Sequence, residues 1–298
     1  MSDSGIRRYV RPVERQARRE RITPLTPKMA EQAIAISTLS PGSKTLLRGL
    51  LELGSVQNFP GGGIGIEYGS LLKTAVRPDI VTGHVEEAAM HLQERQVDVL
   101  LVPGMSGFPI GSIYSYVAGI PAILLRKSEI RPDRPLTYSA GAFVIPSYTG
   151  EGDVVMTADP TGVQDIVDGL LGAQLAAQNE AEELHLSLRC AGADDIIDKA
   201  TMSHAISESA SVIGEVAIET FVSEHRKRTG DQRLAHAHVE VVAWVTPLIK
   251  TYNDPQRHLR RSFGITPFSG LSITGLQTDP QAIGIEGVGM LPLLGHNR

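Results

Sequence analysis

Cysteine, aromatic side chains and long apolar runs are all scarce in this chain of 298 residues. Cys190 is the single cysteine, which excludes an internal disulfide and indicates a reducing compartment. No apolar run approaches the roughly 18 residues that a membrane-spanning helix needs, and the start of the chain lacks the apolar core of a signal peptide. These absences predict a soluble, cytoplasmic protein without a membrane partner.

Several common catalytic patterns are also missing. The sequence contains no Gly-x-Ser-x-Gly elbow, no Cys-His arrangement and no Walker sequence. The glycine run over 61–65 has no preceding strand, and we interpret it as a flexible turn that leads into a short strand over 64–68. His236 and His238 are spaced as on one face of a strand, which can bind zinc, but no further ligand is near them in sequence. No metal ligand from the protein is therefore assigned.

Charge is distributed unevenly along the chain. Residues 1–28 carry eight Lys or Arg against three acidic residues, whereas the remainder carries twenty against thirty. This basic N-terminal arm could contact nucleic acid or an acidic neighbouring subunit, and the simpler interpretation is a solvated arm or short helix. The acidic remainder argues against extended nucleic-acid binding.

Hydrophobic periodicity alternates between that of helices and that of strands, and the hydrophobic fraction of 42% is enough for a substantial core. Helices are expected over 27–53 with a break at Pro41-Gly42, over 79–93, over 110–117 and after residue 160. Strands are expected over 97–102, 122–125, 153–157 and 239–245, with a further pair over 271–276 and 283–291. The segment 180–228 is predicted to be largely helical, although 211–221 could be a strand. This alternation predicts an α/β sheet covered on both faces.

The segment from Val99 to Lys127 reads as a strand, a turn bracketed by glycines, a helix and a second strand. Its turn can present backbone N–H groups to an anion at a helix N-terminus. The segment resembles the type I phosphoribosyltransferases, closest to the adenine phosphoribosyltransferase branch. The residues that carry the resemblance are Gly107-Phe108, Gly111, Tyr116, Gly119, Pro121 and Arg126-Lys127.

The resemblance implies a type I phosphoribosyltransferase-like parallel sheet flanked by helices, to which we add a helical insertion and a C-terminal extension that contains strands. The predicted parts are a basic arm over 1–28, the core over 29–178, the helical insertion over 179–235, and the last core strand with a C-terminal cap over 236–298. Between Ser128 and Thr149 the family has a mobile loop that closes over the reacting centre.

The activity that the resemblance implies is transfer of ribose 5-phosphate from phosphoribosyl pyrophosphate to a nitrogenous heterocycle, with a purine-like base favoured and pyrophosphate released. It also implies Mg²⁺ as the cofactor and a homodimer. The alternative is a non-catalytic protein that keeps the fold and senses a nucleotide or phosphoribosyl pyrophosphate. In a third interpretation, the basic arm and the C-terminal third form a scaffold that binds a partner.

Site residues follow from the same resemblance. The family places two acids and a Thr-Gly-Gly-Thr turn where this chain has Ala158-Asp159 and then 161–164, so Asp159 is expected to be the catalytic acid that binds the ribose hydroxyls. The residues expected to hold the 5-phosphate are Thr161, Gly162, Val163 and Gln164. Those expected to hold pyrophosphate are Gly104, Met105, Ser106, Gly107, Arg126 and Lys127, and Phe108 is expected to stack on the base.

This match has departures. A single acid replaces the usual pair, Val163 and Gln164 replace glycine and threonine, and Ser106 stands where arginine is common. Taken alone, Asp159 or Thr161 would be a helix cap, and Arg126-Lys127 would be a solvated strand end. The prediction requires the turns at Gly104 and Thr161 to share one cavity at the carboxyl edge of the sheet.

Overall fold

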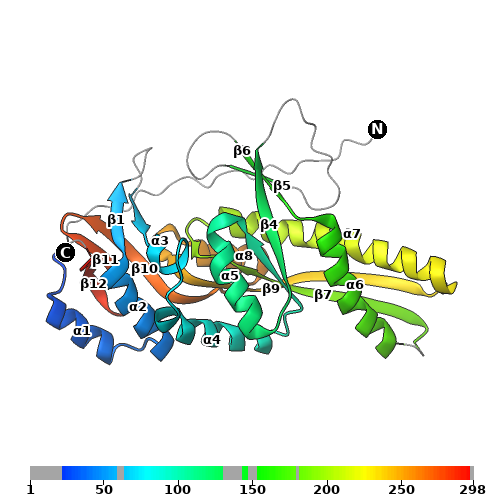
Figure 1. Ribbon diagram of the computed structural model, residues 1–298, viewed down its shortest axis with the longest axis horizontal. Coiled ribbons are helices and arrows are strands. Elements are labelled where there is room, and N and C mark those ends of the chain that lie inside the picture. The colour runs from blue at the N-terminus through cyan, green and yellow to red at the C-terminus, as the bar shows by residue number, and fades with distance from the viewer. Residues whose placement is uncertain (1–21, 59–63, 130–142, 147–152, 179–180, 296–298) are drawn as a thin grey trace.

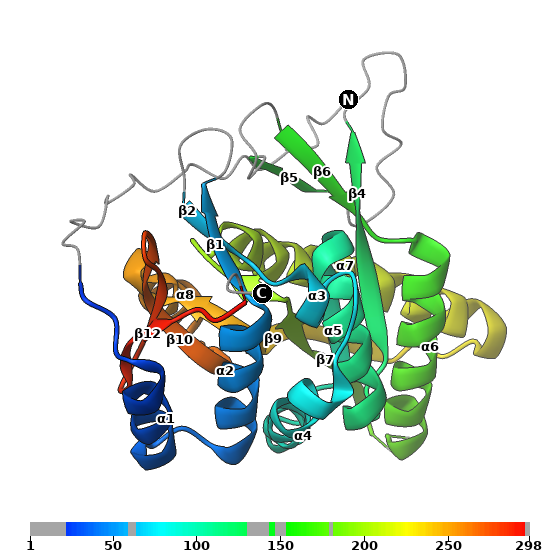
Figure 2. The same cartoon turned by 60° about the vertical axis from the view of Figure 1, so that its left-hand side comes forward.

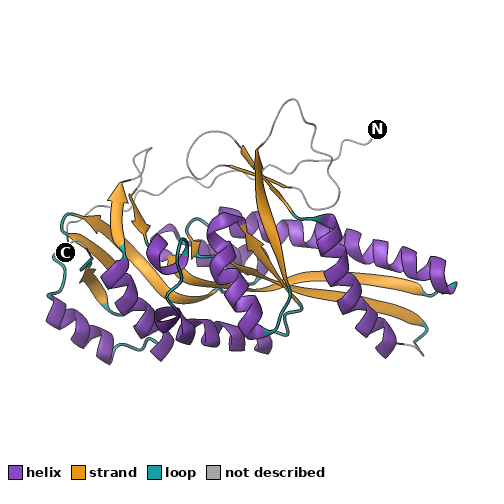
Figure 3. Ribbon diagram, in the orientation of Figure 1, coloured by secondary structure: helices purple, strands orange, loops and turns teal. Residues whose placement is uncertain are grey.

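The computed structural model describes residues 22–58, 64–129, 143–146, 153–178 and 181–295. These residues form one ten-stranded sheet with helices on both faces and a separate two-stranded sheet (Figures 1 and 3). The α/β prediction is confirmed. Most of the predicted basic arm, the glycines at 61–63 and most of the predicted mobile loop lie outside the described residues.

The middle of the large sheet is parallel. Its strands, in spatial order, are β4 (Ala122–Glu129), β3 (Val99–Pro103), β7 (Glu183–Ala193), β9 (Leu234–Lys250) and β10 (Phe268–Thr278). Antiparallel strands extend both ends: β6 (Asp153–Thr157) and β5 (Phe143–Pro146) beyond β4, and β11 (Gln281–Ile285) and β12 (Gly289–Pro292) beyond β10. The short β8 (Ile196–Ile197) pairs with β9, and β1 (Ser55–Asn58) pairs with β2 (Ile64–Glu67).

Two hydrophobic clusters lie on opposite faces of this sheet, because neighbouring residues of a strand point to opposite sides. Leu100 and Val102 of β3 belong to the first cluster, with α1 (Pro27–Ile36), α2 (Pro41–Leu53), α3 (Gly69–Leu72), α4 (Pro78–Glu94) and α5 (Gly104–Ala118). Val99 and Leu101 belong to the second, with α6 (Pro160–Ala177), α7 (Thr201–Thr229) and α8 (Pro255–Phe263). Figure 2 shows α2, α4 and α5 in front of the sheet and α7 behind it.

Local sequence explains where the first helices begin. Thr26 and Ser40 each accept a hydrogen bond from a backbone N–H of the helix that follows, and Pro27 and Pro41 occupy the first helical positions. A polar cap before a proline is a strong helix start signal. The break predicted at Pro41-Gly42 is therefore the start of α2.

The predicted helical insertion is wrong in its first part. Residues 183–193 form β7, which lies between β3 and β9 in the parallel region. Leu184, Leu186 and Leu188 are buried and alternate with His185, Ser187 and Arg189, so the segment has the period of two that a strand requires. Helix follows only in α7, and β9 to β12 account for the strands expected near the C-terminus.

Among the described residues, no helix is both long enough and apolar enough to cross a lipid bilayer.

Candidate functional site

The carboxyl ends of β3, β7 and β9 meet at one edge of the sheet, the edge at which parallel α/β sheets place ligands. Three connections start there. The chain passes from β3 directly into α5, from β7 through residues 194–200 into α7, and from β9 through the short helix η1 (Thr251–Asn253) into α8.

The turn into α5 is built for close approach. Gly104 has a φ of 58°, in the left-handed region that favours glycine, and no side chain in the described part of the chain caps the helix. A Cβ on Gly107 would lie 2.9 Å from Oδ1 of Asp194, so only glycine allows this carboxylate against the first turn. The positive end of the α5 dipole favours negative charge at that point.

Asp194 and Asp195 follow β7 directly and are both buried. The Tyr68 hydroxyl donates a hydrogen bond of 2.7 Å to Oδ2 of Asp195, and Nζ of Lys73 lies 3.5 Å from the same oxygen. Burial, together with the negative charge of Asp195, raises the pKa of Tyr68 well above its usual value, so the phenol stays protonated and donates. The Lys73 ammonium, 4.6 Å from the Tyr68 ring centroid, balances the charge of Asp195.

A partly buried ion pair links the turn between Asp195 and α7 to the end of β9. Nζ of Lys250 lies 3.0 Å from Oδ2 of Asp198, and the Asn253 amide donates to Oδ1 of the same carboxylate. Ala200 ends the turn with a φ of 58° and is buried, a conformation that costs a residue with a Cβ roughly 1–2 kcal/mol. Strain of this kind is retained where the surrounding structure enforces it, and it is concentrated at functional sites.

Asp159, the predicted catalytic acid, is an exposed helix cap in the structure. Its Oδ1 accepts the N–H of Thr161 at 3.1 Å, and its backbone carbonyl accepts the N–H of Val163 at 3.0 Å. The Val163 side chain is buried in the second cluster, and the Gln164 amide donates to Asp168 and to the carbonyl of Ala217. Gly162 lies in the same first turn of α6. The turn thus carries its own anionic acceptor, as the alternative cap interpretation expects.

The two predicted anion-binding turns begin helices on opposite faces of the sheet. Ile110 and Tyr114 of α5 pack in the first cluster, whereas Val167 and Leu171 of α6 pack in the second. The structure does not bring Gly104 and Thr161 together in a described cavity. It brings the Gly104–Gly107 turn together with Asp194 instead.

The remaining predicted residues lie in the first turns of α5 and on β4, with different exposures. Met105 is 79% exposed and Ser106 is partly buried. Phe108 packs against the first cluster. Arg126 is exposed on β4, opposite Thr157 of β6. Lys127 follows it, paired through its backbone with Met156, and its side chain lies outside the described residues.

Sequence reasoning missed the acidic pair Asp194-Asp195. The available signal was an alternating strand, then two acids, a short turn and Thr201 at a helix start. The turn residues Asp198, Lys199 and Ala200 include no glycine, so this turn lacks the feature by which the sequence analysis selects anion-binding turns. Because the sequence pattern predicts 180–228 to be largely helical, it predicts no strand end at this point.

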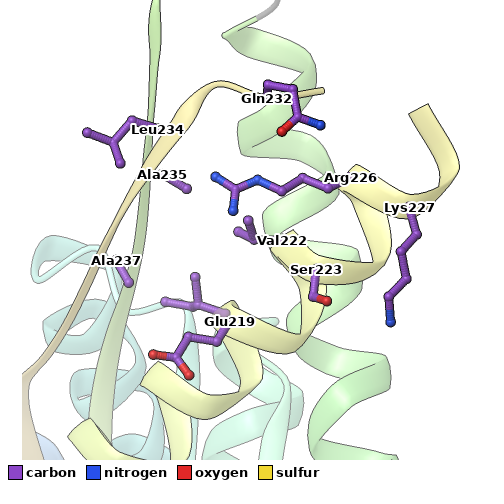
Figure 4. A pocket seen from close by; sticks show the side chains of 10 residues that line it. Glu219, Val222, Ser223, Arg226, Lys227, Gln232, Leu234, Ala235 and Ala237 are labelled. Atoms are coloured by element: carbon purple, nitrogen blue, oxygen red, sulfur yellow. The ribbon is translucent and has the colours of Figure 1, made fainter. Parts of the chain in front are cut away.

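An open groove of about 670 Å³ lies away from these residues, between α7 and the first part of β9 (Figure 4). Apolar and charged side chains both line it, among them Val222, Glu219 and Arg226. None of the predicted site residues lines it.

Potential metal ligands are not clustered. In the part of the chain that the structure describes, no group of three or more His, Cys, Asp and Glu side chains could hold a metal ion. Nε2 of His236 lies 2.9 Å from a Glu183 carboxylate oxygen, and the His236 ring stacks on His185 with centroids 5.0 Å apart. Of the two histidines considered as zinc ligands, His236 therefore has protein partners in these contacts.

Comparisons with known proteins give structural likeness only. No protein-family model matches the chain, and no curated protein does. The chain is similar to adenine phosphoribosyltransferase from Thermoanaerobacter pseudethanolicus, with 15% identity and a TM-score of 0.46, over 75% of this chain and 98% of that one. It is also similar to the Trypanosoma brucei enzyme in complex with AMP, pyrophosphate and ribose-5-phosphate, with 13% identity and a TM-score of 0.47, over 80% and 81%. For the Saccharomyces cerevisiae enzyme the identity is 14% and the TM-score 0.43, over 77% and 99%. At these values the likeness carries no inference about activity or substrate.

Proposed function

We propose that this protein binds phosphoribosyl pyrophosphate at the carboxyl edge of β3 and β7 and transfers its ribose 5-phosphate to a nitrogenous heterocycle. The observation that supports this most is the contact between the glycine turn at the start of α5 and the buried carboxylate of Asp194. The α5 turn suits an anion, and the Asp194 carboxylate suits hydroxyl groups. A pentose with phosphates at both ends carries anions and hydroxyl groups together.

In this proposal the acids at the end of β7 take the role that the sequence analysis gave to Asp159. Asp194 accepts hydrogen bonds from the ribose hydroxyls, while Tyr68 and Lys73 orient Asp195. Backbone N–H groups of the α5 turn hold pyrophosphate, with Arg126 as an additional cation. The C–O bond between the ribose and pyrophosphate breaks, and pyrophosphate leaves with the electron pair. The acceptor nitrogen bonds to the same carbon, and its proton passes to solvent. Little covalent chemistry falls to the protein, so its contribution is positioning and charge stabilisation.

Magnesium fits this donor set through Asp194. Mg²⁺ binds through one or two carboxylates together with substrate phosphates and waters, so a cage of three protein ligands is not needed. Oδ1 of Asp194 accepts the Asp195 N–H at 2.8 Å, while Oδ2 of Asp195 contacts Tyr68 and Lys73. The ion would supply charge neutralisation at the leaving pyrophosphate. The homodimer and the cytoplasmic location remain predictions from sequence.

A sensor that binds without turnover is the second candidate, and one feature favours it. Asp195 is paired with Lys73, and the following turn is held by the pair of Asp198 and Lys250 in place of a glycine-rich loop. A turn built in this way can bind a ligand without the flexibility that closure over a reacting centre requires.

Calorimetric titration with phosphoribosyl pyrophosphate and Mg²⁺, followed by a pyrophosphate-release assay against a panel of bases, tests the proposal. Binding with release supports the enzyme, binding alone supports the sensor, and no binding contradicts both. Asp194→Asn is expected to weaken binding by about 1–3 kcal/mol, because a neutral amide loses charge-assisted hydrogen bonds. Asp159→Asn is the matched comparison, since asparagine is also a good helix cap. A loss of affinity in Asp159→Asn but not in Asp194→Asn would show that the ligand binds at the start of α6 and would contradict the proposed site.

A further inference from the structure

The first part of β9 is an open sheet edge. β7 pairs with β9 from Leu234 to Val245, whereas β10 on the other side pairs with it only from Val245 onward. Among the described residues, no strand pairs with Leu234–Trp244 on the β10 side. Figures 1 and 3 show this part of β7 and β9 extending from the main sheet as a two-stranded ribbon.

This edge offers backbone hydrogen bonds to another strand. Along a strand, the N–H and C=O groups of alternate residues point to opposite sides, so half of those in Leu234–Trp244 face away from β7. Proteins commonly protect such an edge with proline or lysine, and neither occurs between 234 and 244. Leu234 itself is 56% exposed.

We propose that a second copy of this chain covers the edge, with the two β9 strands antiparallel about a two-fold axis at Val239. The length of the edge supports this position. Val239 is the central residue of Leu234–Trp244, so each strand runs along the whole open edge of the other and stops where β10 of the partner subunit begins. The inference does not depend on the proposed function.

Charge supports the same register independently. An axis at Val239 places His238 opposite Glu240 of the partner subunit, and symmetry repeats the pair. Moving the axis by one residue would place His238 opposite itself or Glu240 opposite itself. Oppositely charged or hydrogen-bonding pairs directly across a sheet are favourable, and like charges are not.

The Glu240 carboxylate has room for this contact. Its Oε1 lies 2.5 Å from Arg189, while its Oε2 lies 3.9 Å from Nε2 of His238 in the same chain, beyond hydrogen-bond distance. His238 is 68% exposed at its side chain. Each imidazole can therefore turn to the carboxylate of the partner subunit.

On the opposite face, small side chains allow two strands to meet beside α7. Ala235, Ala237 and Val239 alternate along this face, and the first two line the groove of Figure 4. A Cβ on Gly214 of α7 would lie 2.8 Å from a Val239 methyl group, so α7 packs closely on the residue at the axis. The equivalent small residues of a second copy would continue this surface along the groove.

Sedimentation of the full chain from low micromolar concentration to about 100 μM measures the association. The wild type is expected to be a dimer. His238→Glu places one glutamate opposite Glu240 at each of the two symmetric positions and is expected to raise the dissociation constant roughly tenfold or more. His238→Lys keeps the complementary pair and is expected to remain a dimer. A wild type that is monomeric at the highest concentration, or variants that both behave as the wild type does, would overturn the proposal.

A cross-link tests the register. In Val239→Cys, the introduced thiols of two copies face each other at the axis, at the Cα separation of about 4.5–5.5 Å that a disulfide accepts. Cys190 is buried and does not interfere. Mild oxidation is expected to give a covalent dimer in Val239→Cys but none in the wild type. A dimer that does not cross-link, or amides of 235–243 protected from hydrogen exchange in a monomer, would show another occupant and contradict the inference.

Discussion

His84 is a fully buried titratable residue whose charge state bears on stability. Its Nε2 lies 2.7 Å from the Tyr114 hydroxyl oxygen, its ring stacks on Phe268, and its Nδ1 has no hydrogen-bond partner among the residues that the structure describes. A Cβ on Gly270 would lie 2.9 Å from Nδ1, so the packing at Gly270 leaves no room beside Nδ1 for a hydrogen-bond partner. Burial lowers the pKa of His84 to about 4, and the residue is neutral in the folded protein.

The folded protein is expected to lose stability as pH falls from about 6.5 to about 4. The unfolded chain protonates His84 near its usual pKa of about 6.5, whereas the folded chain does not until about 4. The unfolded state thus binds more protons in this window, and the free energy of unfolding falls by roughly 3 kcal/mol across it. Above the window this contribution is fully present. Urea unfolding at several pH values measures it.

The comparison variant is His84→Gln, which does not titrate. Its free energy of unfolding at neutral pH will differ from that of the wild type, so the slope against pH is the quantity compared. The slope is expected to fall by about 1.4 kcal/mol per pH unit within the window. An unchanged slope would mean that His84 does not account for the acid sensitivity.

Among the elements, α2 and α4 cross with backbone in direct contact. A Cβ on Gly42 would lie 2.5 Å from the carbonyl carbon of Gly83, and a Cβ on Gly83 would lie 2.9 Å from Cα of Gly42. Glu87 strengthens the crossing by accepting hydrogen bonds from the Ser40 hydroxyl and the Gly42 N–H.

Gly42→Ala is expected to destabilise the protein by about 1–3 kcal/mol, because the added methyl group meets backbone that cannot move aside without shifting a helix. Gly169→Ala in α6 is the matched control. None of the described atoms lies within 4 Å of its added Cβ, and alanine favours a helix over glycine by about 1 kcal/mol. Thermal unfolding compares the two, and equal effects would contradict close packing at the crossing.

The Lys250–Asp198 pair joins the end of β9 to the turn before α7. Side-chain exposure is 5% for Lys250 and 13% for Asp198. Lys250→Met is expected to cost about 3–5 kcal/mol, because it leaves a buried carboxylate without its cation. Lys250→Met combined with Asp198→Asn should recover part of this loss. Arg77→Met removes an exposed pair with Asp79 and should have no measurable effect. A double variant no more stable than Lys250→Met would contradict the charge explanation.

The sequence predicted elements, such as α2, whose ends are marked by local capping residues. It missed β7, whose place in the sheet depends on its neighbouring strands. Ser40 and Pro41 mark the start of α2 by themselves. The strand β7 is identified by alternation alone, and the helical pattern that follows it masked that alternation. Asp194 and Asp195 were lost with it, because an acid is a site candidate only when a strand is known to end there. Asp159 had the right local chemistry, yet that chemistry also suits a helix cap.

At the scale of the whole molecule, the strands β3, β7 and β9 contribute side chains to both hydrophobic clusters. Trp244 of β9 is fully buried, donates a hydrogen bond of 3.0 Å to the Ser207 hydroxyl of α7, and lies so close over Gly192 of β7 that a Cβ there would be 2.2 Å from its ring. Cys190 of β7 is paired with Val99 of β3 on one side and with Val241 of β9 on the other. Both residues therefore report on the middle of the sheet.

Cys190 is expected to react with a thiol reagent only when the sheet opens as a whole. Burial raises the pKa of its thiol to about 12, so the folded protein offers neither access nor thiolate. Because the two clusters share β3, β7 and β9, loss of one removes the support of the other, and the denaturant midpoint of labelling should match that of Trp244 fluorescence. The fully denatured chain, in which the thiol is accessible, is the positive control. Labelling at denaturant concentrations that leave the fluorescence unchanged would show that β7 opens locally while the rest of the sheet remains folded.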